Sequence, residues 1–249
     1  MSDRINIQIV SDLHIPEDIP VDFREYFTVS APYLIIAGDI CTTKNKVLYK
    51  QFIRSICLEY KIVFLVAGNH EYYSYCEKFE DIRMFLHSLQ IDISNLYFLD
   101  NTYYDLPDSD VRIYGTTLWS DAIHGRKKLP INSYYGDAGT GNWFKMMHYD
   151  SLYKTEQIMV KSYNEKKRLI IATHYPPTKK HTVYEYQLSS LTSSYYINNL
   201  DDYLIKEYVY IWIYGHTHVN SDYFSENNCR VLSNQYRANF YNPQKIIKL

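Results

Sequence analysis

The chain has 249 residues and a formal net charge of −2, from 26 Lys and Arg against 28 Asp and Glu. That length fits one α/β or β-sandwich domain, and 46% apolar with 22% charged residues excludes intrinsic disorder. The balanced charge and a sequence pI near 6.5 argue against a general nucleic-acid coat protein or a basic membrane-binding protein. Eight glycines and nine histidines stand beside 28 tyrosines, so the positions of glycine and histidine are the more informative.

The four cysteines lie far apart with no C-x-x-C pair, which argues against a zinc ribbon and against a small disulfide-bonded secreted domain. The N-terminal sequence MSDRINIQIV does not resemble a signal peptide. No stretch approaches the ~18 consecutive apolar residues of a transmembrane helix. We therefore expect a soluble, cytoplasmic protein with no membrane partner, and the sequence leaves its oligomeric state open.

Short apolar, β-branched runs recur along the chain and predict strands that are buried on both faces. These runs cover residues 5–10, 33–37, 62–67, 96–99, 111–114, 168–172, 209–214 and 230–233. Periodic apolar residues predict helices at 45–60, 77–90, 148–167 and 197–208. Strands that alternate with helices indicate an α/β layered fold, and the absence of repeats or linkers indicates a single domain over residues 1–249.

Five of the predicted strands end in polar residues of metal-binding type. The segments at these ends are Ser11-Asp12-Leu13-His14, Gly38-Asp39, Gly68-Asn69-His70-Glu71, Thr173-His174 and Gly215-His216-Thr217-His218. Ligands bind at the carboxyl ends of strands in open α/β sheets. Imidazole, carboxylate and amide donors suit divalent ions such as Mn, Fe, Zn or Ni. Each motif alone is weak, but five together indicate a pair of metal ions, with Asp39 as the natural bridging carboxylate.

This five-part pattern resembles that of the calcineurin-like metallophosphoesterase superfamily, over residues 12–218. The resemblance implies a four-layer α/β/β/α sandwich with two mixed β-sheets and two divalent metal ions. Mn is the metal expected first, with Fe, Zn, Ni or Mg as alternatives. His70 matches a catalytic histidine of the family that is not a metal ligand. The implied metal ligands are Asp12, His14 and His218 for the first ion, Asn69, His174 and His216 for the second, and Asp39 between them.

The sequence departs from the protein Ser/Thr phosphatases of this superfamily. Ile40-Cys41-Thr42-Thr43 follows Gly38-Asp39, and Ala67 stands where those enzymes have a basic residue. A protein phosphatase of that class is therefore not expected. No obvious Asp is present to pair with His70, so its role as a general acid stays open. Residues 115–121 resemble a segment of uncharacterised bacterial and viral members.

Two stretches, residues 119–147 and 175–196, break the alternation of strands and helices and are interpreted as active-site insertions. Loops at the active edge usually set specificity. Each aromatic or basic residue there has a plain alternative as ordinary loop packing or solvated surface. The candidate substrate contacts are Trp119, Asp121, Arg126 and Trp143.

The sequence thus predicts a metal-dependent hydrolase in which a metal-bridging hydroxide attacks a phosphate monoester or diester, with a small phosphoester or nucleotide as substrate. A metal-dependent nuclease on short single strands is one alternative, which the basic runs at 126–128 and 166–168 keep open. The net charge of −2 does not favour strong nucleic-acid binding. A non-catalytic scaffold of the same fold predicts eroded ligands, whereas all seven are present.

Overall fold

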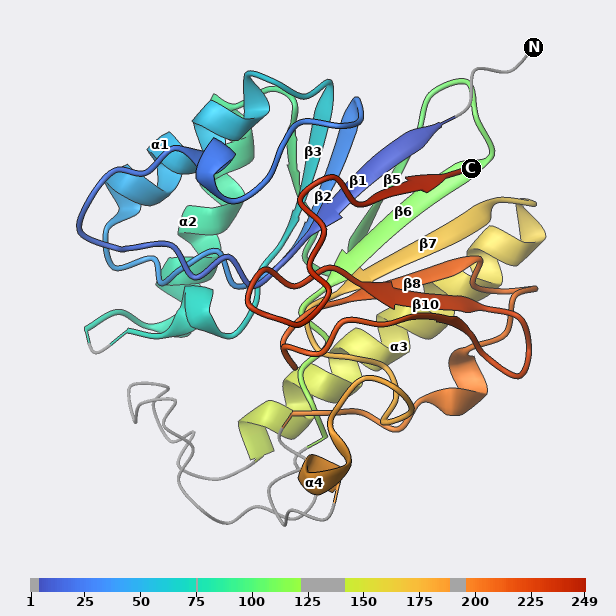
Figure 1. Cartoon of the computed structure of the whole chain (residues 1–249). Helices are drawn as coiled ribbons and strands as arrows, with labels where there is room; N and C mark the ends of the chain where they lie inside the picture. Colours follow the sequence, from blue (N-terminus) through green and yellow to red (C-terminus); the bar gives the residue numbers. More distant parts are fainter. Residues whose placement is uncertain (1–4, 75, 122–141, 189–195) are drawn as a thin grey trace.

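The computed structural model describes residues 5–74, 76–121, 142–188 and 196–249, which form two mixed β-sheets packed face to face with helices outside them (Figure 1). The first sheet has the order β11 (Ile246–Lys248), β1 (Asn6–Val10), β2 (Tyr33–Ala37), β3 (Ile62–Val66) and β4 (Leu96–Phe98). The second has the order β5 (Thr102–Asp105), β6 (Val111–Thr116), β7 (Arg168–Thr173), β8 (Ile211–Tyr214), β10 (Arg230–Ser233) and β9 (Asp222–Phe224). The expected α/β/β/α sandwich is confirmed.

Parallel pairing carries the polar motifs to one edge of the sandwich. Strands β1, β2 and β3 are mutually parallel, as are β6, β7, β8 and β10, while β11, β5 and β9 pair antiparallel at the sheet edges. Ala37 pairs with Val66 across β2 and β3, so the segments after these strands leave the sheet side by side. The carboxyl ends of parallel strands therefore bring residues distant in sequence together.

The layer between the sheets is a core of buried aliphatic and aromatic side chains. Ile35 and Phe64 from the first sheet, and Ile170 and Ile213 from the second, are each at most 1% exposed. The alternate residues of the same strands, such as Ile36 and Val63, are buried on the opposite face in a cluster with residues of α1 (Lys46–Cys57) and α2 (Phe79–Asp92). Burial on both faces explains why the predicted strands are continuous apolar runs rather than alternating ones. This core packs against both sheets next to the strand ends where the polar motifs lie.

Helices α1 (Lys46–Cys57) and α2 (Phe79–Asp92) cover the outer face of the first sheet, and α3 (Asn142–Asn164) covers that of the second (Figure 1). Asn45 begins α1, because its side-chain oxygen accepts a hydrogen bond from Leu48 N at 3.2 Å. Among the described residues there are also four short helices, η1 (Phe23–Glu25), η2 (His70–Tyr72), α4 (Glu185–Leu188) and η4 (Asp201–Tyr203). No described helix is long and apolar enough to cross a membrane.

The prediction of a helix at 197–208 is wrong, because only the 3₁₀ turn η4 forms there. The carboxylate of Asp201 accepts hydrogen bonds from Thr178 Oγ1 at 2.9 and 3.0 Å, so it is fixed to the neighbouring segment. The segment also contains Asn198, Asn199 and Asp202, and Asn and Asp favour caps and turns over helix interiors. The apolar positions that suggest a helix are buried in irregular backbone, and they are Ile197, Leu200 and Leu204.

Helix α3 also differs from its predicted span of 148–167. It begins at Asn142 and ends at Asn164. Lys166 has a φ of 54°, and Lys167 N donates to Ser162 O at 2.9 Å, which together end the helix in a Schellman-type turn. Residues 122–141 and 189–195, which belong to the two predicted insertions, lie outside the described residues.

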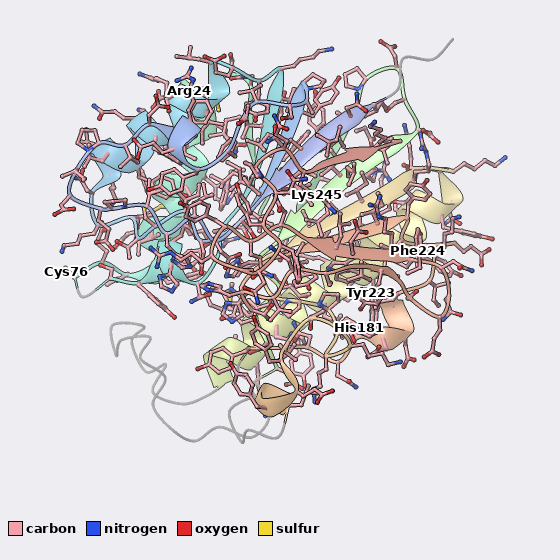
Figure 2. All side chains as sticks on the ribbon, viewed as in Figure 1. Arg24, Cys76, His181, Tyr223, Phe224 and Lys245 are labelled. Atoms are coloured by element: carbon pink, nitrogen blue, oxygen red, sulfur yellow. The ribbon has the colours of Figure 1, made fainter. Side chains whose placement is uncertain are left out.

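The C-terminal segment connects the two sheets. It leaves β10 in the second sheet, passes the residue Lys245 labelled in Figure 2, and ends as β11 in the first. Ser11 N donates to Asn234 O at 3.1 Å, and Tyr236 N donates to Ser11 O at 3.0 Å. Lys245 Nζ lies 2.7 Å from Asp222 Oδ2. The segment therefore ties the end of β1 to the end of β10.

Replacement of Phe64 by alanine tests the core between the sheets. Phe64 is fully buried, so Phe64→Ala should lower the free energy of unfolding by about 3–5 kcal/mol through lost burial and a residual cavity. Urea unfolding followed by circular dichroism measures this. Leu58→Ala is the control, because Leu58 is 81% exposed and should change stability by less than about 0.5 kcal/mol. Equal effects of the two substitutions would contradict this location of the core.

Candidate metal centre

The predicted ligands converge at the edge where the parallel strands end. Three groups of side chains each bring their donor atoms within 4.8 Å of one another. The groups are Asp12, His14 and His218; His14, Asp39 and His70; and Asp39, His174 and His216. Because His14 and Asp39 are each shared by two groups, the cluster is continuous from Asp12 to His216.

The backbone of the cluster is strained in a consistent way. Five of the candidate ligands have a positive φ, a region that costs a residue other than glycine about 1–2 kcal/mol. They are Asp12 (55°), His14 (44°), Asp39 (56°), His216 (75°) and His218 (54°). Sparsely populated backbone conformations gather at functional sites, where the surrounding structure enforces them. Five of the seven candidate ligands therefore present their side chains from a strained backbone.

Two glycines provide the space for this arrangement. Gly38 has a φ of 89°, and a Cβ atom there would lie 2.4 Å from His174 Nδ1. A Cβ atom at Gly68 would lie 2.1 Å from Asp39 Oδ1. Both distances are far below van der Waals contact, so a side chain at either position would displace a candidate ligand.

Asp39 lies at the centre of the cluster and is 2% exposed. Its Oδ1 accepts a hydrogen bond from His70 N at 2.9 Å and lies 3.3 Å from His174 Nε2. Its Oδ2 lies 3.8 Å from His14 Nε2 and 3.9 Å from His70 Nε2. Burial opposes ionisation, but the adjacent histidines, His174 above all, hold the pKa of Asp39 below its ordinary value. Asp39 is therefore a carboxylate whose two oxygens face both halves of the cluster.

His174 is fully buried, and its ring orientation is fixed. Its Nδ1–H donates to Ala37 O at 2.9 Å, which leaves Nε2 facing Asn69 Oδ1 at 3.0 Å and His216 Nδ1 at 3.2 Å. Burial disfavours the imidazolium, but nearby Asp39 outweighs that effect and raises the pKa of His174 to about 9. Without a metal, His174 therefore carries a proton at neutral pH.

The amide of Asn69 is oriented from its other end. Its Nδ2 donates to Tyr73 Oη at 2.7 Å, so its Oδ1 faces His174. The Tyr73 ring also contacts the His70 ring, with 4.5 Å between centroids. Tyr73 thus steadies two motif residues, although the sequence pattern assigns it no role.

His14 and His216 are neutral imidazoles at neutral pH. Burial lowers the pKa of His14 to about 4, and burial together with His174 lowers the pKa of His216 well below its ordinary value. The buried Nε2 of His216 has no hydrogen-bond partner among the described residues. Neutral imidazoles, two carboxylates and one amide oxygen form a donor set that fits divalent ions of the Mn-to-Zn series. The residues present therefore fit a metal centre.

His70 and His218 form the open side of the cluster. Their side chains are 37% and 41% exposed, whereas the Asp12 side chain is fully buried. His218 Nε2 lies 3.5 Å from Asp12 Oδ1 and 3.2 Å from His14 Nε2, and the hydrogen bond to Asp12 raises the pKa of His218. The His70 ring stands 4.6 Å from that of His14. A substrate would reach the cluster past these two rings.

Glu71 binds the backbone next to Asp39, a role that the sequence pattern does not assign to it. Its fully buried carboxylate accepts hydrogen bonds from the backbone N atoms of Asp39 (3.0 Å), Ile40 (2.7 Å) and Gly68 (2.7 Å). Burial and the charge of Asp39 raise the pKa of Glu71 to about 7. Its position directly after Gly68-Asn69-His70 is the only signal in the sequence, because two of its three backbone donors, Asp39 N and Ile40 N, follow β2 and come close to it only in the folded chain.

The proposed substrate contacts have different outcomes. Trp119 is 1% exposed and packs against Tyr72, Phe79 and Tyr175, which places it in the core and does not support its assignment as a substrate contact. Asp121 is half-buried after the end of β6. Arg126 and the side chain of Trp143 lie outside what the structure describes.

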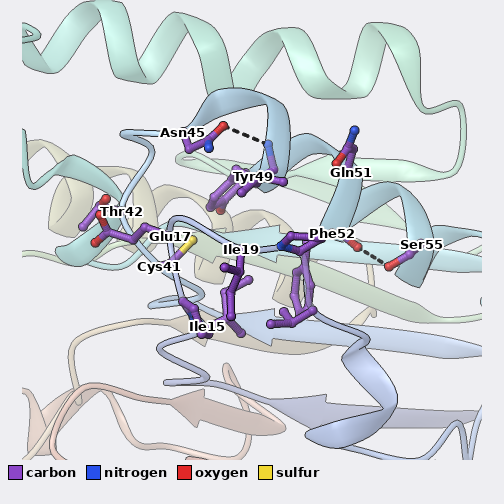
Figure 3. Close-up of a pocket in the computed structure, with 14 residues that line it drawn as sticks. Ile15, Glu17, Ile19, Cys41, Thr42, Asn45, Tyr49, Gln51, Phe52 and Ser55 are labelled. Carbon is purple, nitrogen blue, oxygen red and sulfur yellow. Dashed lines mark hydrogen bonds between the residues drawn. The ribbon is translucent and has the colours of Figure 1, made fainter.

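A separate cavity of about 220 Å³ lies between residues 15–21 and α1, as Figure 3 shows. None of the seven candidate ligands lines it. Cys41 does, but burial raises the pKa of its thiol well above the ordinary value, so the thiol stays protonated and is a poor nucleophile. Tyr49 also lines the cavity, and its hydroxyl lies 3.3 Å from Glu71 Oε1.

Residues 5–220 match the calcineurin-like phosphoesterase family. An uncharacterised protein of Acanthamoeba polyphaga mimivirus is 28% identical over 239 residues, which cover 87% of this chain and 84% of the relative. The crystal structure of the phosphopantetheinyl hydrolase of Mycobacterium tuberculosis has the same fold, with a TM-score of 0.68 at 12% identity over 100% of this chain and 97% of that one. The family implies a dinuclear divalent metal centre, for which this chain has candidate ligand groups. The chain belongs to the calcineurin-like phosphoesterase family and is a metal-dependent phosphoester hydrolase.

Proposed function

We propose that this chain hydrolyses small phosphate esters or nucleotides at a centre of two metal ions. The observation that carries the proposal is Asp39, whose carboxylate belongs to two donor groups and has oxygens facing both. One ion would be held by Asp12, His14 and His218, and the other by Asn69, His174 and His216, with Asp39 shared. Mn²⁺ is the ion we propose first, because it accepts this mixture of nitrogen and oxygen donors.

Two such ions would neutralise phosphate charge and lower the pKa of a water molecule for attack on phosphorus. The chain's own residues would position the reaction. His70 stands at the open side near Asp39 Oδ2, where its imidazole can hydrogen-bond a phosphoryl or leaving-group oxygen. The bond from His174 Nδ1 to Ala37 O and the bond from Asn69 to Tyr73 fix two ligand orientations in advance.

An exposed aromatic ring lies beside the candidate ligands, where a planar group of a small phosphate ester or nucleotide could stack. Tyr196 is 48% exposed and stacks on His216 with 5.7 Å between centroids and 25° between planes, so a planar substrate group has an aromatic surface beside the ligands. The basic run at 166–168 does not support a nuclease. Arg168 begins β7, at the strand end opposite His174, and its guanidinium pairs with Asp110 at 2.6 Å.

A hydrolysis screen with Mn²⁺-reconstituted protein tests the proposed substrate class. The panel comprises p-nitrophenyl phosphate, bis(p-nitrophenyl) phosphate, nucleotides, cyclic nucleotides, a phosphopantetheinyl ester and short oligonucleotides. We expect metal-dependent turnover of a small ester or nucleotide that exceeds turnover of every oligonucleotide. Preferential cleavage of oligonucleotides would instead identify a nuclease.

Asp39→Asn tests the shared carboxylate. The amide keeps the shape of the side chain but removes its charge and one acceptor oxygen, so metal content should fall and activity should drop by at least about 100-fold. Elemental analysis and an assay on p-nitrophenyl phosphate measure the two effects. Asp100→Asn is the control, because Asp100 is 9% exposed and is held by Arg83 and His87 away from the cluster. Full metal content in Asp39→Asn would show that this residue does not bridge.

Metal uptake should release protons. The pKa of His174 is raised to about 9, so a metal ion at Nε2 must displace a proton below that pH. Apparent Mn²⁺ affinity should therefore rise by about tenfold per pH unit between pH 7 and 8.5. The same raised pKa stabilises the metal-free fold below pH 6.5, and this contribution is lost as the pH rises through about 9. Titration calorimetry in buffers of different ionisation enthalpy counts the protons, and a count of zero at pH 7 would contradict the assignment of His174.

A further inference from the structure

His218 is the candidate ligand that packing restrains least. Its side chain is 41% exposed, against 0% for His174 and 2% for Asp39. Its backbone also has a φ of 54°, a conformation that an isolated loop would leave readily. A ligand of this kind can bind a metal strongly only if its backbone is held in place from outside the loop.

Gln235 supplies that restraint. It is fully buried and lies at the start of the segment that follows β10. Its Oε1 accepts a hydrogen bond from His218 N at 2.6 Å, and its Nε2 donates to Val219 O at 2.8 Å. The backbone N–H of Gln235 also donates a hydrogen bond to Asn220 Oδ1 in the same loop, at 2.7 Å. The side-chain amide of Gln235 thus clamps the backbone on both sides of the His218 α-carbon.

The same segment also reaches Asp12. Gln235 forms a parallel bridge with Ser11, whose hydroxyl donates to Asp12 Oδ2 at 2.6 Å. Ser11 N donates to Asn234 O at 3.1 Å and Ser11 O accepts from Tyr236 N at 3.0 Å. The backbone around Gln235 is therefore fixed to the strand that carries Asp12, while its side chain is fixed to the loop that carries His218.

We propose that Gln235 is a positioning residue for the metal ion held by Asp12, His14 and His218, and that it sets the distance between the β1 ligands and His218. The inference rests on the proposed dinuclear centre. Gln235 contacts none of the donor atoms, so its effect passes through the backbone of His218. Outer residues that orient metal ligands typically change metal affinity by about 10- to 100-fold.

Gln235→Met tests this role, because methionine keeps the length and volume of the side chain but removes both hydrogen bonds. Gln8→Met is the matched control. Gln8 is also fully buried, but it bonds to Thr28 O (2.9 Å), Pro243 O (3.0 Å) and Ser30 N (2.9 Å), away from the cluster. Gln235→Glu keeps an acceptor for His218 N and serves as the partial rescue.

The readout is Mn²⁺ binding to each purified full-length protein by titration calorimetry, with thermal unfolding by circular dichroism recorded in parallel. Wild type and Gln8→Met should each bind two ions. Gln235→Met should bind one ion as tightly as wild type and the other about 10- to 100-fold more weakly. Gln235→Glu should lie between Gln235→Met and wild type. His218→Ala identifies the affected site, since it removes a ligand of that ion.

A double-mutant cycle completes the test. If Gln235 acts through His218, the Gln235→Met/His218→Ala double variant should bind metal no more weakly than His218→Ala alone. Additive losses, or wild-type affinity at both sites in Gln235→Met, would overturn the positioning role. Equal weakening of both sites in Gln235→Met and Gln8→Met would do the same, as it would reveal general destabilisation. Wild type that binds fewer than two ions would overturn the dinuclear centre itself.

Discussion

The attraction between Asp39 and His174 organises the polar edge of this protein. Asp39 follows β2 in the first sheet and His174 follows β7 in the second, and their facing atoms lie 3.3 Å apart. Both are almost completely buried, where an unpaired charge would be very costly. The pair therefore fixes how the ends of the two sheets meet. It also leaves Asp39 Oδ2 facing His14 and His70.

Several unusual local features follow from that constraint. A Cβ atom at Gly38 would clash with His174, and a Cβ atom at Gly68 would clash with Asp39. Glycine at both positions therefore lets the two side chains approach each other. The backbone of Asp39 has a φ of 56°, and Glu71 holds that conformation by accepting the N–H groups of residues 39, 40 and 68. Gln235 performs the corresponding task for the loop of His218. In each case a buried side chain outside the ligand set stabilises strained backbone inside it.

The features that could be predicted from sequence are those with a strong local pattern. Buried parallel strands appear as apolar runs, and the polar residues after them converge because parallel strands share an edge. The edge strands β5, β9 and β11 could not be predicted, since they are three or four residues long and partly exposed. The burial of Trp119 could not be predicted either, because the aromatic residues that cover it, Tyr72 and Tyr175, are distant in sequence. The partners of Glu71 and Gln235 are likewise distant in sequence and depend on the assembled fold.

In the proposed centre, the carboxylate of Asp39 lies between two metal ions. Anomalous X-ray diffraction at the manganese absorption edge, from crystals of the Mn²⁺-loaded protein, tests it most directly. We expect two anomalous peaks about 3.5–4 Å apart, with Asp39 between them and the remaining six ligands divided three and three. A single peak, or two peaks with Asp39 bound to only one of them, would contradict it.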